Sequence, residues 1–168
     1  MRDGIVVELD ELEVKIAELV GEHRHLEGRA NGGTEHFVIA DGDDARRERN
    51  AAGAELAVCK VLGGWWETIA GHRAPGDVRV DGTLVEVKHT PHATGFLALK
   101  DRDRSALVVM VVGELPTFRV VGWGHTDELR AAHPIAETNP RNGRPLPFPC
   151  HVVEQHELKP LLDRRTTS

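Results

Sequence analysis

The dipeptide Asp81-Gly82 constrains the fold of this chain more than any other feature, because it joins two runs of alternating apolar and polar residues. Asp-Gly in that setting is a strong hairpin signal, since a two-residue type I′ turn needs positive φ at both central positions. The turn also sets the register, in which Val78 faces Val85. The sequence therefore predicts a tight β-hairpin over residues 77–88.

Alternation along this hairpin separates an apolar face from a charged one. Asp77 and Glu86 should lie directly opposite each other on the charged face, with Cβ atoms roughly 4.5–5.5 Å apart. Two like charges so close are destabilising unless a cation lies between them, and Mg²⁺ suits such a carboxylate pair. Lys88 shares this face and is placed to orient a water or to stabilise developing negative charge. The alternative is a half-solvated hairpin whose polar face simply carries mixed charges.

A helix should precede the hairpin, beginning at Asp43 or Asp44 and ending near Leu62. Glu55 lies on the apolar face of this helix, four residues before Cys59. A carboxylate on a buried stripe is costly without a partner. Either Glu55 pairs with an arginine or lysine at the edge of the core, or it is a third acidic group directed at the two hairpin carboxylates.

The rest of the chain carries further strand, helix and turn signals. Residues 106–112 form a continuous valine-rich run, which predicts a strand that is buried on both faces and covered by helices or loops. We further expect a short strand over 5–7, a helix capped by Asp10, strands over 65–70 and 117–123, a strand or one helical turn over 96–99, a helix over 126–132, mostly loop over 133–149 and an edge strand over 151–153.

Length and composition indicate a single domain over residues 1–168, in which 1–45 form an N-terminal appendage, 46–125 the core and 126–168 a C-terminal helix and loop extension. The net charge of −6 argues against nonspecific coating of nucleic acid by a basic surface. No apolar run is long enough to span a membrane, and the first residues lack the apolar region of a signal peptide. Two cysteines do not make a disulfide framework, so a cytoplasmic setting is expected.

Several enzyme classes lack their sequence signals in this chain. There is no Gly-x-x-x-x-Gly-Lys phosphate loop and no dinucleotide-binding fingerprint. Ser105 and Ser168 are the only serines, and neither lies in a Gly-x-Ser-x-Gly setting. Cys59 and Cys150 do not have the spacing of a zinc finger.

Two clusters of basic residues are candidates for contacts with nucleic-acid phosphates. One cluster opens the helix that carries Glu55, and the other lies where basic and acidic residues alternate. In both cases a solvated charged surface is the alternative. The residues are Arg46, Arg47, Arg49, Lys100, Arg102 and Arg104.

The order helix, strand, hairpin, strand, strand, with acidic residues at these places, resembles the PD-(D/E)xK nuclease superfamily, which includes restriction endonucleases, junction resolvases and phage recombination nucleases. The pattern reads Pro75-Gly76-Asp77, then eight residues, then Glu86-Val87-Lys88, with Glu55 on the preceding helix. The likeness covers roughly residues 46–125 and is closest in style to small nuclease-like proteins of phages and their hosts. It implies an α/β fold with a restriction-endonuclease-like core, in which a central mixed β-sheet is flanked by helices.

The resemblance also implies a metal-dependent phosphodiesterase that acts on DNA, in the host cytoplasm if the protein is encoded by a phage. Asp77, Glu86 and the backbone carbonyl of Val87 would hold Mg²⁺ or Mn²⁺, and Glu55 would bind a second metal or a metal-bound water. Lys88 would position the attacking water or stabilise the pentacovalent charge. Two alternatives stay open: a non-catalytic module of this fold that binds nucleic acid or protein, and an unrelated α/β domain with a chance motif. A homodimer is also open.

Overall fold

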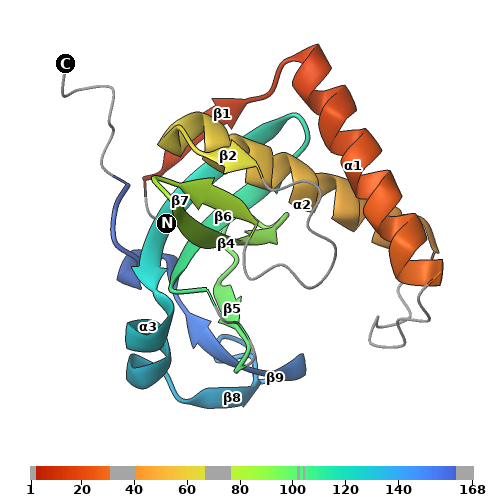
Figure 1. Ribbon diagram of the computed structural model, residues 1–168. Helices are drawn as coiled ribbons and strands as arrows, with labels where there is room; N and C mark the ends of the chain where they lie inside the picture. The colour runs from red at the N-terminus through yellow and green to blue at the C-terminus, as the bar shows by residue number, and fades with distance from the viewer. Residues whose placement is uncertain (1–2, 31–40, 67–76, 102, 104, 162–168) are drawn as a thin grey trace.

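The computed structural model describes residues 3–30, 41–66, 77–101, 103 and 105–161, and these form a mixed α/β fold (Figure 1). A six-stranded mixed sheet has the strand order β1-β7-β6-β4-β3-β2, and a smaller sheet has the order β5-β9-β8. None of the helices in the described residues combines the length and apolar content needed to cross a membrane. In chain order the elements are β1 (Ile5–Glu8), α1 (Glu11–Ala30), α2 (Asp41–Leu62), β2 (Trp65–Trp66), β3 (Val78–Val80), β4 (Thr83–Thr90), β5 (Leu97–Leu99), β6 (Leu107–Glu114), β7 (Thr117–His125), α3 (Thr126–Ala132), β8 (Ile135–Thr138), β9 (Pro145–Val153) and the short 3₁₀ helix η1 (Gln155–Glu157).

The predicted Asp81-Gly82 turn is confirmed and joins β3 to β4. Asp81 has φ 48° and Gly82 has φ 81°, the left-handed values that a type I′ turn requires. Val78 pairs with Val85, as the register predicts. β4 then runs parallel to β6, whereas β6 and β7 are antiparallel, which makes the sheet mixed.

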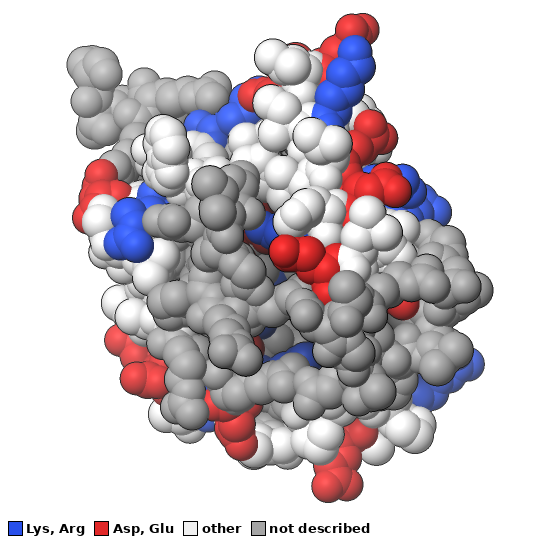
Figure 2. All heavy atoms as spheres, turned by 45° about the vertical axis from the view of Figure 1, so that its right-hand side comes forward, with Lys and Arg blue, Asp and Glu red and all other residues white. Residues whose placement is uncertain are grey.

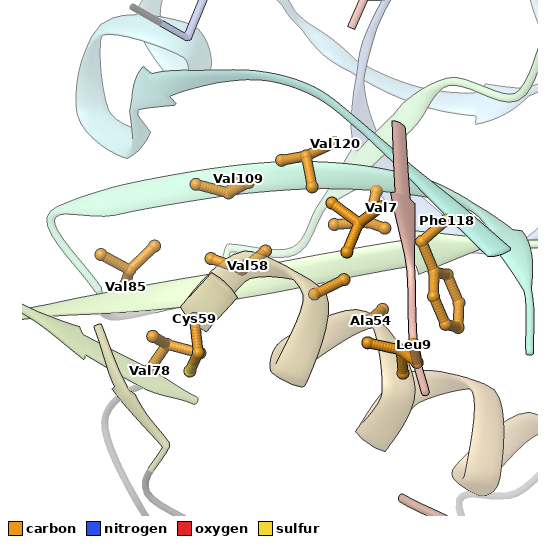
Figure 3. Close-up of a cluster of buried hydrophobic side chains, with 12 residues drawn as sticks. Val7, Leu9, Ala54, Val58, Cys59, Val78, Val85, Val109, Phe118 and Val120 are labelled. Carbon is orange, nitrogen blue, oxygen red and sulfur yellow. The ribbon is translucent and has the colours of Figure 1, made fainter. Parts of the chain in front are cut away.

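Two hydrophobic cores lie on the two faces of the six-stranded sheet. On one face, α2 packs Ala54, Val58 and Cys59 against valines of the sheet, as Figure 3 shows. On the other face, Val108 and Met110 of β6 pack against side chains of β5, β9 and α3. The prediction of a sheet flanked by helices therefore holds for one face only, because a small β-sheet with α3 covers the other.

The N-terminal segment is part of the fold, which corrects the prediction of an appendage over residues 1–45. β1 is an edge strand of the main sheet and pairs with β7, and α1 packs along α2. Asp10 caps α1 by accepting hydrogen bonds from the backbone N–H groups of Leu12 and Glu13, as the sequence predicts. The pairing with β7 joins residues more than a hundred positions apart, and no local pattern reports it.

The C-terminal segment differs from its prediction, because the expected loop over 133–149 contains β8 and most of β9. β9 is the middle strand of the small sheet and not an edge. Its prolines argue against a strand, since proline cannot donate to the ladder. They fall at alternate positions, Pro145, Pro147 and Pro149, so only one side of the strand loses its donors. β5 pairs only with the proline-free end of β9, from His151 to Val153.

The close approach of α1 to α2 depends on Gly21. A Cβ atom at this position would lie 2.4 Å from the Cα of Arg49 and 2.5 Å from its backbone nitrogen. We expect Gly21→Ala to lower the free energy of unfolding by about 1–3 kcal/mol, because the helices must separate and this overpacking outweighs the higher helix propensity of alanine. Glu18→Ala, on an exposed position of the same helix, is the control and should change the value by less than about 0.5 kcal/mol. Urea denaturation measures both, and an unchanged or more stable Gly21→Ala protein would contradict the expectation.

Candidate functional site

Asp77 lies immediately before β3, where the hairpin ladder ends. Its backbone N–H donates to the carbonyl oxygen of Val85 at 3.0 Å, and its carboxylate Oδ2 accepts from the N–H of Val87 at 2.7 Å. The ladder pairs of β3 and β4 run from Val78 to Val80 in the predicted register, and Asp77 with Glu86 is not one of them. β3 begins at Val78, and the side chain of Asp77, just before it, serves as the acceptor for the backbone N–H of Val87.

The environment of Asp77 disfavours its ionised form. Burial raises the pKa of this carboxyl to about 7, and the nearby carboxylates of Glu55 and Glu86 add to the rise. The N–H of Val87 and the ammonium of Lys88 act in the opposite direction. Asp77 is thus close enough to both other predicted acidic residues to be affected by their charge, and a cation bound beside it would relieve the repulsion.

Glu86 and Lys88 project from β4 on the face away from α2, because Val85 and Val87, which alternate with them, join the core under α2. Lys88 Nζ lies 2.8 Å from Glu86 Oε1 and 3.1 Å from Asp103 Oδ1. Burial opposes the charged form of Lys88, but the two carboxylates outweigh it and raise the pKa of the ammonium. Lys88 is therefore a fixed positive charge between two acids.

Glu55 is on α2 as predicted, and it forms the ion pair with a basic residue that the sequence allows. Arg24 of α1 donates to both carboxylate oxygens, at 2.6 and 2.8 Å, and Trp66 Nε1 donates to Oε2 at 2.6 Å. Burial raises the pKa of the Glu55 carboxyl, and the bonds from Arg24 oppose that rise. Both carboxylate oxygens of Glu55 thus accept hydrogen bonds from Arg24 and Trp66. The role of Glu55 as a metal ligand stays a prediction.

The three acidic residues do not converge on one point. Among residues 3–30, 41–66, 77–101, 103 and 105–161, no group of three or more His, Cys, Asp or Glu side chains is arranged to hold a metal ion. Asp77 is bonded to the backbone of β4, and the charges of Glu55 and Glu86 both act on its carboxyl. Mg²⁺ in proteins is commonly held by one or two carboxylates, with waters and substrate phosphates completing the shell. Asp77 and Glu86 are carboxylates of the kind that such a smaller site uses, and their role as metal ligands with the carbonyl of Val87 stays a prediction.

The sequence did not reveal three residues that contact the predicted site residues, namely Arg24, Asp103 and Ser105. Arg24 comes from α1, thirty-one positions before Glu55, and no motif links the two. Asp103, which binds Lys88, belongs to the alternating charges that predict either a solvated loop or phosphate contacts. Ser105 also reaches the site, with its hydroxyl 3.4 Å from Glu86 Oε2.

Of the basic residues expected to contact phosphates, the structure describes three on α2 and Lys100 directly after β5. Arg46 pairs with Glu114 at the end of β6 that is distant from Val108, the neighbour of Glu86. Lys100 lies over the ring of Phe148, 4.2 Å from its centroid. Arg47 and Arg49 are in the first half of α2, and Arg102 and Arg104 lie outside the described residues. The phosphate contacts of all six stay a prediction.

His89 turns away from the charged site, because successive side chains of β4 point to opposite faces of the sheet. Its Nε2 atom lies 2.7 Å from the carbonyl oxygen of Gly113, and its ring packs edge-on against Phe118. Burial lowers the pKa of this imidazole. His89 therefore packs on the face of β4 opposite to Lys88.

The raised pKa of Asp77 predicts a pH-dependent stability. Between the ordinary value of 3.8 and the folded value of about 7, the folded protein keeps a proton that the unfolded chain loses. The free energy of unfolding should therefore fall as pH rises through this window, by up to about 1.4 kcal/mol per pH unit. Asp77→Asn keeps an acceptor for Val87 and cannot ionise, so it should raise the melting temperature at pH 8 and change it little at pH 4.

Calorimetry at both pH values measures this difference. Glu137→Gln, on an exposed position of β8, is the matched control and should behave alike at pH 4 and pH 8. An Asp77→Asn protein with the same change in melting temperature at both pH values would show that burial does not perturb this carboxyl.

Comparison with protein-family models, curated proteins and solved structures found no match to this chain.

Proposed function

We propose that this protein is a metal-dependent nuclease that hydrolyses phosphodiester bonds of DNA, built on a restriction-endonuclease-like core. The observation that carries the proposal is the position of Asp77, a half-buried acid beside Glu86 and Glu55, with Lys88 fixed two residues after Glu86. The proposal is supported by the place of Glu86 and Lys88 on β4, which pairs with β3 and runs parallel to β6, and by Asp77 directly before β3. The negative charges of Glu55 and Glu86 repel the ionised form of Asp77, and a bound divalent cation would relieve this repulsion.

Asp77, Glu86 and the carbonyl of Val87 would hold Mg²⁺ or Mn²⁺, which supplies Lewis-acid polarisation of the phosphate and a more acidic water. Lys88 is protonated in this setting, so it orients the water or stabilises charge that develops on the phosphate, and does not act as a base. Glu86 and Asp103 fix the position of that ammonium from two sides. Preorganised charges of this kind lower the barrier because they need no rearrangement during the reaction.

Arg24 extends this machinery from outside the motif. Its guanidinium neutralises Glu55, and it also interacts favourably with the charge of Asp77. Arg24 therefore limits the repulsion between the acids when the site holds no cation, and it determines whether Glu55 can turn toward a ligand. In the proposed enzyme it is a positioning residue.

The second candidate is a non-catalytic member of the same fold that binds nucleic acid or another protein. Two observations favour it: both oxygens of Glu55 are engaged by Arg24 and Trp66, and no three-acid metal group exists in the described part of the chain. A module of this kind would bind labelled DNA or a protein without turnover in any metal.

Cleavage of plasmid and single-stranded DNA in Mg²⁺ or Mn²⁺ tests the nuclease directly. We expect the wild-type protein to cut, and Asp77→Asn, Glu86→Gln and Lys88→Ala to lose activity by at least about 100-fold. Glu114→Gln removes an exposed ion pair at the far end of β6 and should keep full activity. Cutting that survives in all three site variants would assign the activity to a contaminant or to another site.

Binding of the metal itself has a readout that does not depend on activity. At pH 8, Mn²⁺ should raise the melting temperature progressively above its dissociation constant, by about 2–4 °C for each kcal/mol of binding energy in a chain of this size. Asp77→Asn should abolish the shift. Asp127→Asn, which changes an exposed acid on α3, should preserve it. An equal shift in all three proteins would indicate nonspecific binding.

A further inference from the structure

The helix α1 has two opposite faces, and only one of them is explained by the fold of a single chain. The inner face packs on α2 through Val14, Ala17 and Gly21, and it carries Arg24 to Glu55. These positions recur at intervals of four and three residues, so they form one stripe along the helix. The tight contact at Gly21 fixes the orientation of α1, so the opposite face must point outward.

That outer face carries a second stripe, and it is apolar. Leu12, Ile16, Leu19 and Leu26 are 67%, 40%, 75% and 60% exposed, and His23 fills the remaining position of the stripe. α1 lies at the periphery of the molecule (Figure 1), and Figure 2 shows uncharged atoms on the upper part of this side, bordered by charged ones. A contiguous apolar stripe on an exposed helix is unusual for a monomer and is typical of an interaction surface.

The spacing of this stripe is that of a coiled coil. The intervals from Leu12 to Leu26 are four, three, four and three residues when His23 is included, which is a heptad pattern with Ile16 and His23 at position a and the leucines at position d. A helix of 20 residues is about 30 Å long, enough for four layers of such packing. We propose that this face binds the same face of a second copy of the chain, with the two α1 helices antiparallel.

Charge complementarity selects this occupant and its register. When the helices cross between Ile16 and Leu19, Ile16 of one copy packs on Leu19 of the other, and Leu12 packs on His23. Position g of one helix then faces position g of the other, which brings Lys15 of each copy beside Glu22 of the second copy. The pair forms twice because a two-fold axis relates the copies. Charges at such flanking positions set the partner and orientation in coiled coils.

The other arrangements bring like charges together. In a parallel pair, Glu22 of one helix lies beside Glu27 of the other. In an antiparallel pair shifted by one heptad, Glu22 faces Glu22, and Glu13 faces Glu27. Only the register centred between Ile16 and Leu19 pairs opposite charges, so the same residues that attract the correct partner also exclude the incorrect ones.

Sedimentation equilibrium on the full chain, from about 1 µM to about 1 mM, tests the dimer. The mass should rise from 18.5 kDa towards twice that value with increasing concentration. Leu19→Glu should weaken self-association by at least about tenfold, because it places a charge at the centre of the interface. Ile135→Glu, at a 49% exposed apolar residue on β8, is the matched control and should associate like the wild type. Circular dichroism checks that each variant is folded.

A charge swap tests the antiparallel register. Lys15→Glu and Glu22→Lys should each weaken association, and the double variant should restore it. The two single variants mixed together should form a heterodimer, because every flanking pair is then opposite in charge. A monomer at all concentrations, a dimer insensitive to Leu19→Glu, or a double variant as weak as the singles would overturn the proposal. None of these residues belongs to the proposed nuclease site, so the two proposals stand or fall separately.

Discussion

Burial of β6 on both faces is the constraint on which the rest of the structure depends. Its side chains alternate between two cores, with Val109 and Val111 on one side and Val108, Met110 and Val112 on the other. A strand with no polar face must be covered by two layers. The helix α2 supplies one layer, and the sheet of β5, β8 and β9 with α3 supplies the other. β4 then lies beside β6 with one face in the core and one face free to carry charge.

The candidate site lies at the start of β3, beside β4. β3 begins at Val78, and Asp77 just before it provides a side-chain acceptor for the backbone N–H of Val87 on β4. The same position brings Asp77 close to acids on α2 and on β4, so its carboxyl carries a raised pKa. Unfavourable charge retained in a folded protein is typical of sites under selection for function, since a neutral residue would be more stable there.

The two faces of helix α1 serve the two proposals, the inner face the nuclease site and the outer face the dimer. Its inner face holds Glu55 through Arg24, and its outer face carries the heptad stripe. Gly21 makes this division possible, because the close approach to α2 leaves α1 no freedom to turn its leucines inward. A helix that contributes one residue to an acidic site and a whole face to the surface is well placed to hold two such sites at a fixed distance in a dimer.

The sequence by itself determined the features whose causes are local. The left-handed turn at Asp81-Gly82, the alternation of β4, the apolar run of β6 and the cap at Asp10 all follow from neighbouring residues. The same local rules placed Glu55, Glu86 and Lys88 on their helix and strand. They found only residues 151–153 of β9 and missed β8, because the prolines of the 133–149 stretch outweigh the strand pattern until the pairing partner is known.

Only the tertiary structure decided which residues meet. Arg24 and Asp103 reach the site from distant segments, and the pairing of β1 with β7 turns a supposed appendage into part of the sheet. It also decided that the heptad leucines of α1 face outward, where the sequence pattern alone fits a buried face equally well. The physical reason is common to these cases: long-range contacts are selected by the free energy of packing the whole chain, and no local periodicity encodes that choice.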